Sequence, residues 1–373
     1  MENHNIGFPE GRKPIRQFPV PVENRAIRRE EWFTNVYQMV LLIVVSAVLT
    51  IVGLDRVGGI GGLVDKVPAD YWVMFRPNSD ADFPWLPIIL GYPVMGVWFW
   101  CTDQSMVQPV LAARNLKEGQ LGTNLTGWLK ILDVFLYILP GIICYALFHD
   151  TLSNPDEAYL TMVENLFPVG MVGLVFAVLT ACLVSTIGSA LNALSTVFTI
   201  DIYVKRFRPD APQQHINYVG RIVTVCGALL AIVLTVAIDS IKGLNLFNVF
   251  QSVLGFIAPP MAAVFLLGVF WKRTTTRAAN LALTAGTAFC LIVGVLYLWP
   301  PSWLHIEWPH FMMLSFLLFV VLALMMALVS LTDKTKPATG IVITKERTPL
   351  SPLVITLWLS LAAVMIGLYV FFN

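Results

Sequence analysis

Nine long apolar stretches constrain this chain more than any other feature of its sequence. They lie at about residues 33–54, 83–110, 122–148, 169–203, 218–239, 246–271, 277–299, 309–331 and 352–372. Each holds the roughly 20 mostly apolar residues that an α-helix needs to cross a bilayer. Hydrophobic residues make up 57% of the chain and charged residues 13%, a balance that a soluble domain could not carry. We therefore expect an all-α integral membrane protein with about nine transmembrane helices, a multi-pass protein of the cell (plasma or inner) membrane.

Basic residues are distributed unevenly between the loops that join these stretches. With a cytoplasmic N-terminus, the inside loops hold 19 Lys and Arg residues and the outside loops hold 4. This excess predicts an N-in, C-out orientation. Residues 1–31 are polar and rich in proline and charge, so we expect a cytoplasmic N-terminal segment followed by a transmembrane domain at 32–373.

The second stretch, around residues 91–115, differs from an ordinary membrane helix. Small and cyclic residues that loosen a helix come first: Gly91, Pro93 and Gly96. An aromatic band and a polar run follow: Trp98, Phe99, Trp100, Thr102, Asp103, Gln104, Ser105 and Gln108. A carboxylate in the bilayer costs several kcal/mol unless it is paired or wetted, so Asp103 indicates a pathway or a structural lock. Interrupted spanning helices are also typical of transporter binding sites.

Signals for other classes of function are absent from the sequence. It contains no phosphate-binding loop, no metal-ligand cluster and no nucleophile motif, so we expect no enzyme, no catalytic residues and no organic cofactor. The net charge of +1 does not indicate the excess of basic residues that nucleic-acid binding requires.

Four segments carry a resemblance to a known family. They read WFWCTDQSMVQPVLAARNL, WLKILDVFLYILPGI, LVSTIGSALNALSTVFTIDIY and FNVFQSVLGFIAPPMAAVFLLGVFWKR, at residues 98–116, 128–142, 183–203 and 247–273. In this order and spacing they resemble the sodium:solute symporter family, close to its sodium/glucose cotransporter branch. The resemblance covers roughly residues 32–373.

The resemblance implies a partial LeuT-like fold, which is built on an inverted repeat of five plus five core helices. The first stretch resembles the last helix of the first repeat, 83–273 the second five-helix repeat, and three C-terminal helices follow. About five earlier helices of the family have no counterpart here. The implied function is sodium-coupled symport of a sugar-like solute, with sodium as coupling ion and the only metal ion. We do not expect the chain alone to concentrate solute.

The sodium ligands implied by the resemblance lie in one helix. They are the carbonyl of Cys182 and the hydroxyls of Ser185 and Thr186, which the i, i+3, i+4 spacing places on one face. From the spacing alone, an alternative stays open, because such hydroxyls often bond to the carbonyl four residues earlier.

The implied solute contacts are neutral groups, one cation and an aromatic ring. Gln251 and Lys130 match sugar-contacting positions, Phe99 stands where the family usually has a stacking Tyr, and Gly96 where others have Asn or Thr. The alternative for Gln251 is a bond between helices, worth about 1 kcal/mol. For Phe99 and Trp100 the alternative is plain packing.

A last group consists of gating or structural polar positions, namely Trp100, Asp103, Gln104, Asp133 and Asn35. Asn35 stands where the family commonly has Asp, so we expect no second cation site. Asp133 is three residues from Lys130, and the two can pair on one helical face. Asp103 has either a gating role or a role as a packing lock between helices.

Expected partners are sodium, a sugar or related polyol, the lipid bilayer, and a complementing membrane chain or a second copy. Nucleic acid is not expected. Two alternatives to transport stay open: a non-transporting membrane solute sensor, and an inactive truncated transporter fragment. An appended signalling domain would favour the sensor, and a neighbouring reading frame encoding four or five spans would favour the transporter.

Overall fold

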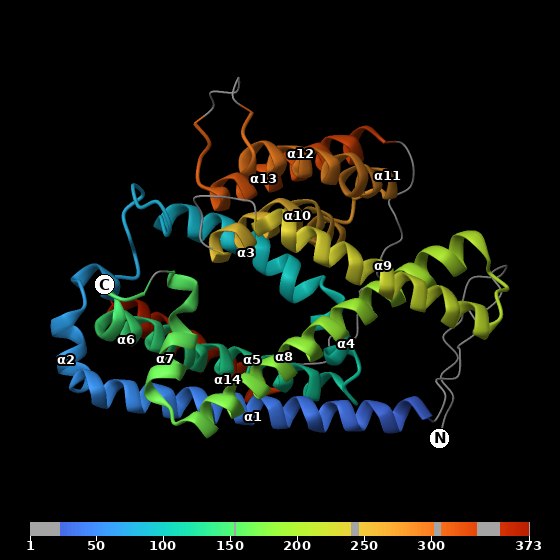
Figure 1. Cartoon of the computed structure of the whole chain (residues 1–373). Helices are drawn as coiled ribbons and strands as arrows, with labels where there is room; N and C mark the ends of the chain where they lie inside the picture. Colours follow the sequence, from blue (N-terminus) through green and yellow to red (C-terminus); the bar gives the residue numbers. More distant parts are fainter. Residues whose placement is uncertain (1–22, 153, 240–245, 302–306, 334–350, 373) are drawn as a thin grey trace.

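The computed structural model describes residues 23–152, 154–239, 246–301, 307–333 and 351–372, and every regular element in these ranges is helical (Figure 1). The main helices, including the shorter ones that form part of a membrane-length run, are α1 (Glu23–Val57), α3 (Trp85–Cys101), α4 (Gln104–Leu111), α5 (Leu116–Asp133), α6 (Leu139–Phe148), α8 (Val169–Thr196), α9 (Gln213–Asp239), α10 (Leu246–Phe270), α12 (Thr287–Leu298), α13 (Phe311–Thr332) and α14 (Pro352–Phe371). Shorter elements are α2 (Gly59–Lys66), η1 (Ala69–Trp72), η2 (Val134–Ile138), η3 (Pro155–Glu157), α7 (Ala158–Leu166), η4 (Val197–Phe207), α11 (Thr276–Leu281) and η5 (Ala282–Gly286). The predicted all-α class is confirmed.

The number of spans also agrees with the sequence. Among the described residues, eight helical runs are long and apolar enough to cross a membrane. The helices α3 and α4 pass the same test together but are bent by 51° at their break, so the number is nine if this pair is one broken span. The first span runs over Phe33–Val57, but its helix already begins at Glu23, within the segment expected to be a polar tail. Residues 1–22 of that segment lie outside the described residues.

The helices form two layers (Figure 1). The first layer contains α3 and α10–α13, and its core gathers around Phe256, Leu322 and Met326. The second contains α1, α5–α8 and α14, and one core of this layer gathers around Leu49 and Ile143. Because α4 contacts both α5 and α8, the bent span α3–α4 crosses from the first layer to the second.

The two ends of the described chain lie on opposite sides of the molecule. In Figure 1, α1 starts at the right and α14 ends at the left, near α2. The backbone N–H of Met74 donates to the carbonyl of Phe372 at 3.1 Å, which fixes the end of α14 against the loop after η1. This is the arrangement that an odd number of passes requires. The orientation relative to the membrane and the assignment of helices to repeats stay predictions.

Candidate functional site

The bend in the second span lies at Thr102 and Asp103. The hydroxyl of Thr102 donates to the carbonyl of Trp98 at 2.6 Å, and the backbone N–H groups of Thr102 and Asp103 donate to the same oxygen at 3.1 Å. Asp103 then caps α4, because its Oδ1 accepts from the backbone N–H of Ser105 at 2.9 Å and of Met106 at 3.3 Å, and from the Ser105 hydroxyl. A helix that stops inside a membrane leaves unpaired donors, and this carboxylate satisfies two of them.

Gly91, Pro93 and Gly96, which were expected to loosen the helix, all lie inside helix α3, and the bend falls further along, at Thr102 and Asp103. Gly91 instead lets α13 approach. A Cβ atom at this position would lie 2.1 Å from the carbonyl oxygen of Met312. A Cβ at Gly96 would meet nothing within 4 Å. Glycine here serves packing between helices, which cannot be read from one segment.

Each hydrogen bond that the structure gives the Asp103 side chain stays within residues 103–106. The choice between a gating role and a packing lock for Asp103 stays a prediction. Gln104 is the first residue of α4 and is half-buried. The ring of Trp100 is exposed and meets the ring of Phe99 edge-on, with centroids 5.0 Å apart. Phe99 itself is half-buried.

The three predicted sodium ligands lie together on α8. The Thr186 hydroxyl donates to the carbonyl of Cys182 at 2.9 Å, which is the local bond that the spacing left open as an alternative. The Ser185 hydroxyl donates to Oδ1 of Asn35 on α1 at 2.7 Å. A donating hydroxyl keeps its lone pairs, so both oxygens can still accept from a cation. In both hydroxyls the hydrogen points toward its acceptor, and the lone pairs of the oxygen remain free for a cation.

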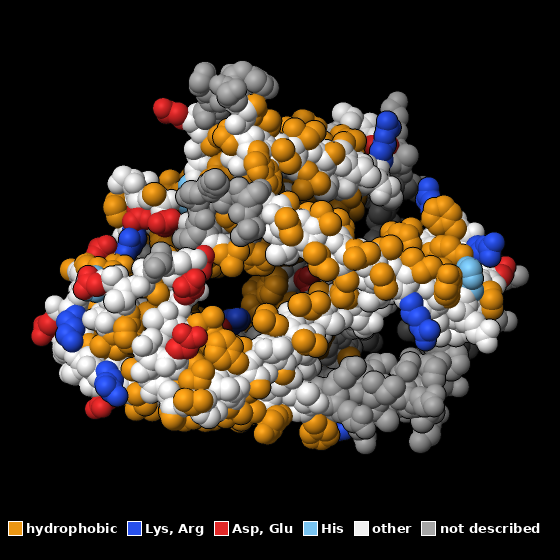
Figure 2. All heavy atoms as spheres, viewed as in Figure 1, with side chains coloured by type: hydrophobic (Ala, Val, Ile, Leu, Met, Phe, Trp, Pro, Cys, Tyr) orange, Lys and Arg blue, Asp and Glu red, His pale blue; other side chains and the backbone are white. Residues whose placement is uncertain are grey.

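The predicted solute contacts are divided between the layers. Gln251 lies on α10, is only 8% exposed, and forms no hydrogen bond through its side chain within the described residues. Lys130 lies on α5, where its Nζ is 2.9 Å from Oδ2 of Asp133, so the predicted ion pair is confirmed. Phe99 and Gly96 lie on α3, in the layer of Gln251. Figure 2 shows openings between the two layers.

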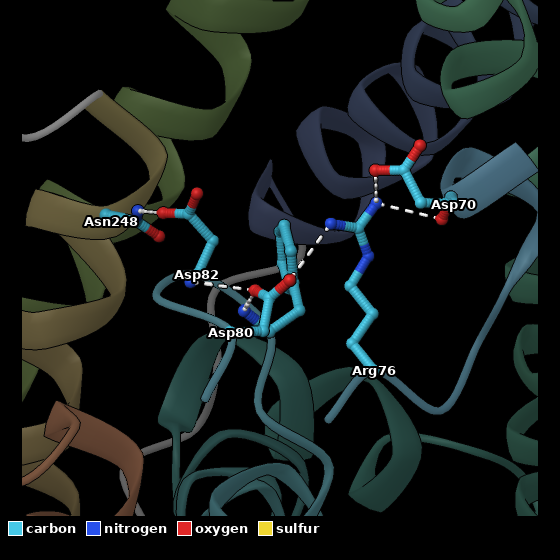
Figure 3. Close-up of polar contacts among 6 residues, drawn as sticks. Asp70, Arg76, Asp80, Asp82 and Asn248 are labelled. Atoms are coloured by element: carbon cyan, nitrogen blue, oxygen red, sulfur yellow. Dashed lines mark hydrogen bonds and ion pairs between the residues drawn. The ribbon is translucent and has the colours of Figure 1, made fainter. Parts of the chain in front are cut away.

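A polar network at the N-terminal end of α10 was not predicted (Figure 3). Arg76 holds the loop by bonding to Oδ2 of Asp80 at 3.0 Å and to the carbonyl of Asp70 at 2.9 Å. Asp80 accepts from the backbone N–H of Asp82 and of Phe83, and the bond from Phe83 is the main cause of the lowered pKa of this carboxyl. The loop is thereby shaped to present Asp82.

Asp82 connects this loop to the helix that carries Gln251. Nδ2 of Asn248 donates to Oδ1 of Asp82 at 2.6 Å (Figure 3). The Ser252 hydroxyl donates to the Asn248 carbonyl, also at 2.6 Å. Asp80 and Asp82 lie two residues apart in the sequence. The partner of Asp82 on α10 was not predicted, because the two lie 166 residues apart.

His310 joins the same junction from the start of α13. Its Nδ1 accepts from the backbone N–H of Met312 at 3.3 Å, and its ring stacks near Phe311 with centroids 4.4 Å apart. Burial lowers the pKa of this imidazole, while a hydrogen bond to the backbone of Asp82 and the charges of Asp82 and Asp80 oppose that shift. The neutral ring is therefore the form that fits this junction.

A multi-pass helical membrane protein with one span broken at a capped polar turn has the architecture of secondary transporters. Residues 30–286 match the family model described as "Sodium:solute symporter family", and the chain belongs to this family. The predicted resemblance is thus confirmed, as is a multi-pass protein of the cell membrane. Members of this family are transporters.

Curated relatives extend the comparison. The chain is 33% identical over 296 residues to "Sodium/glucose cotransporter 4" of Danio rerio, covering 70% of this chain and 44% of the relative. It is 32% identical over 293 residues to "Sodium/myo-inositol cotransporter 2" of Rattus norvegicus, with 70% and 43% covered. It is 34% identical over 289 residues to "Sodium/mannose cotransporter SLC5A10" of Bos taurus, with 69% and 48% covered. The chain spans less than half the length of these relatives.

Proposed function

We propose that this chain takes part in sodium-coupled symport of a sugar-like solute, and that it acts as a transporter component and not as an enzyme. The observation that carries the proposal is the span broken at Thr102 and Asp103, in a chain that belongs to a symporter family. A broken span frees backbone groups at membrane depth, and transporters of this kind use such groups to bind ions and solutes.

The sodium site that we propose uses the Cys182 carbonyl with the Ser185 and Thr186 hydroxyls. Sodium prefers hard oxygen ligands, and the bonds of the two hydroxyls leave their lone pairs available. Three oxygens cannot replace a hydration shell of about six waters without a large cost. The chain alone should therefore bind sodium weakly, and a complementing membrane chain or a second copy should supply further oxygens.

For the solute we propose a sugar or a related polyol, the class named for the relatives. The Gln251 amide is buried and has an uncommitted donor and acceptor, which suits a hydroxyl group. The Phe99 ring offers an apolar face for stacking on the solute ring. Lys130 is held by Asp133 at 2.9 Å, so its contribution requires that this pair opens.

Binding measurements test the proposal with the purified chain in lipid nanodiscs. Sodium, compared with potassium, should raise the affinity for radiolabelled glucose or myo-inositol, and solute should raise the affinity for sodium by the same factor. Ser185→Ala should remove the sodium effect, and Gln251→Ala should weaken solute binding about tenfold or more. The matched control is Ser360→Ala, which removes a hydroxyl that bonds to the Leu357 carbonyl on α14.

Transport is measured separately with the chain as the sole transporter in liposomes. We expect no concentrative uptake, because the sodium site has too few oxygens. Strong sodium-driven uptake that Ser185→Ala abolishes would show that the chain completes its own site, contrary to this account. Solute binding that is identical in sodium and potassium would favour a solute sensor over a symporter.

A further inference from the structure

A polar groove lies between α8–η4 and α9, away from the proposed sodium site. It has a volume of about 460 Å³, and its lining includes Ser195, Thr196, Thr199, Asn217, Arg221 and Thr224. Ser195 follows Ser185 by ten residues, which places the groove about 15 Å further along the helix, toward the end predicted to face the cytoplasm. The groove is therefore a second location, distinct from the one where the family resemblance places its ion and solute contacts.

Thr199 is the most unusual group in this groove. Its side chain is only 4% exposed, and its hydroxyl has no hydrogen-bond partner among the described residues. Gly220 of α9 faces it, because a Cβ at Gly220 would lie 3.7 Å from the Thr199 hydroxyl and 3.1 Å from that of Ser195. A buried hydroxyl without a partner lowers the stability of the fold by about 1–3 kcal/mol. A ligand that accepts the hydrogen of this hydroxyl would remove that cost.

The other polar groups divide into committed and uncommitted ones. The Ser195 and Thr224 hydroxyls both donate to the carbonyl of Gly220, and the Thr196 hydroxyl donates to that of Asn192. Nε2 of Gln213 donates to Oδ1 of Asn217, which leaves the Asn217 amide N–H groups uncommitted. Arg221 forms no ion pair within the part of the chain that the structure describes.

Among the described residues, the Arg221 guanidinium has no ion-pair partner, the Asn217 amide has uncommitted donors, and the Thr199 hydroxyl has no hydrogen-bond partner. A guanidinium repels a sodium ion, and its hydrogen bonds to an oxyanion are stronger than those to a neutral sugar hydroxyl. No Asp or Glu belongs to the described lining, and two more arginines lie nearby in the sequence, Arg206 in the last turn of η4 and Arg208 directly after it. Phosphate is one of the oxyanions that match the planar fork of an arginine.

The surroundings of Arg221 indicate what carries the phosphate. Val225 and Leu229 follow it at i+4 and i+8 on the same face of α9, and each is 58% exposed. From Arg221 to the end of α9 at Asp239 the helix rises about 27 Å, close to the thickness of the hydrocarbon core. Arg221 therefore sits at headgroup depth, above an apolar stripe that suits an acyl chain.

We propose that this groove binds a phosphate group through Arg221, Asn217 and Thr199, and that the phosphate is the headgroup of an anionic phospholipid in the cytoplasmic leaflet. The acyl chains lie along the exposed apolar face of α9, beyond Val225 and Leu229. This site goes beyond sodium and solute binding, since it requires neither ligand.

Thermal unfolding of the full chain tests the proposal in detergent with added dioleoylphosphatidylglycerol, dioleoylphosphatidylcholine or inorganic phosphate. Phosphatidylglycerol should raise the melting temperature in a saturable way, and phosphatidylcholine much less. Arg221→Gln should weaken the apparent affinity for phosphatidylglycerol about tenfold or more. The matched control is Arg208→Gln, which removes the same charge from the neighbouring loop and should leave the affinity unchanged.

Thr199→Val gives a second, independent readout. Without lipid the variant should be as stable as the parent or more stable, because it removes a buried unsatisfied hydroxyl. With phosphatidylglycerol its stabilisation should be smaller than that of the parent, and Thr199→Ser should restore it. If Arg221→Gln does not fold, Arg221→Lys replaces it, keeping the charge and losing the fork.

Three outcomes would overturn the proposal. If Arg221→Gln and Arg208→Gln lose the same amount of affinity for phosphatidylglycerol, the attraction to anionic lipid is unspecific. Equal protection of the parent and Thr199→Val by phosphatidylglycerol would mean that a water satisfies the hydroxyl. Saturable protection by inorganic phosphate that competes with phosphatidylglycerol, and that Arg221→Gln abolishes, would assign the groove to a soluble phosphate and overturn the lipid assignment.

Discussion

The side-chain hydroxyl of Ser185 donates a 2.7 Å hydrogen bond to the amide oxygen of Asn35, 150 residues earlier in the chain. This bond joins α1 to α8 across the second layer. The bond also gives a role to Asn35, which stands at a position where the family commonly has Asp. An amide oxygen that accepts from Ser185 positions the hydroxyl of a proposed sodium ligand without adding a charge.

The first prediction concerns this bond. Asn35→Ala and Ser185→Ala should each lower the free energy of unfolding by about 1 kcal/mol or less, the range for hydrogen bonds between membrane helices. The double variant should cost no more than either single variant, because the two groups share one interaction. Unfolding of the four proteins in one detergent measures the coupling, and additive losses would show that the bond is not formed.

The second prediction concerns the close approach of α3 and α13. Gly91→Ala should destabilise the protein by about 1–3 kcal/mol, because its Cβ would overlap the Met312 carbonyl and the helices must separate. Gly96→Ala, five residues further along the same helix, should be neutral or slightly stabilising, since its Cβ enters open space. Thermal unfolding compares the two, and equal effects would contradict the packing described above.

The third prediction separates the two properties of Asp103, its charge and its hydrogen bonds. Asp103→Asn should keep the stability of the protein, because asparagine caps helices as well as aspartate does. Asp103→Ala should cost about 0.5–2 kcal/mol, because α4 loses the acceptor for the Ser105 and Met106 N–H groups. If Asp103→Asn is as damaging as Asp103→Ala, the negative charge matters in addition to the cap.

The fourth prediction concerns the Lys130–Asp133 pair. Asp133→Val leaves a lone ammonium beside the start of the π-helical segment η2 and should cost up to about 3 kcal/mol where hydrocarbon surrounds it. Lys130→Met combined with Asp133→Val removes both charges and should recover most of the loss. Expression level and melting temperature report the effect, and equal damage in the single and double variants would show that the charges are not coupled.

The fifth prediction concerns pH. Burial lowers the pKa of His310 in the folded protein, so the unfolded chain takes up this proton first as pH falls. The stabilisation is complete above the unfolded pKa of about 6.5 and is lost as pH falls through the folded pKa. His310→Asn keeps an acceptor for the Met312 N–H but does not titrate. Between about pH 7.5 and about pH 5.5, the parent should therefore lose more thermal stability than this variant.

A smaller loss in the parent than in His310→Asn would reverse the sign and contradict a neutral His310. Asp80 acts at lower pH than His310. Its lowered pKa means that its contribution is present above the usual carboxyl range and disappears only in stronger acid, as pH falls through the folded pKa. The two groups can therefore be distinguished in one titration of stability.

The sequence by itself determined the membrane spans and the short-range pairs. A spanning helix satisfies its own backbone, and the bilayer fixes its length, so hydropathy located the eight spanning helices and the bent pair α3–α4 of the described residues. The Lys130–Asp133 pair followed from three-residue spacing on a helix. Both conclusions depend only on geometry within one segment, and such geometry is the same whatever the neighbouring helices do.

Only the tertiary structure decided which segments meet. The partner of Ser185 on α1, the partner of Asp82 on α10 and the carbonyl that faces Gly91 on α13 all lie far away in the chain. Many apolar faces could pack on α3, so its sequence could not show that Gly91 serves close packing while the bend falls at Thr102 and Asp103. That choice depends on the shapes of the helices that surround each residue, and these exist only once the layers have formed.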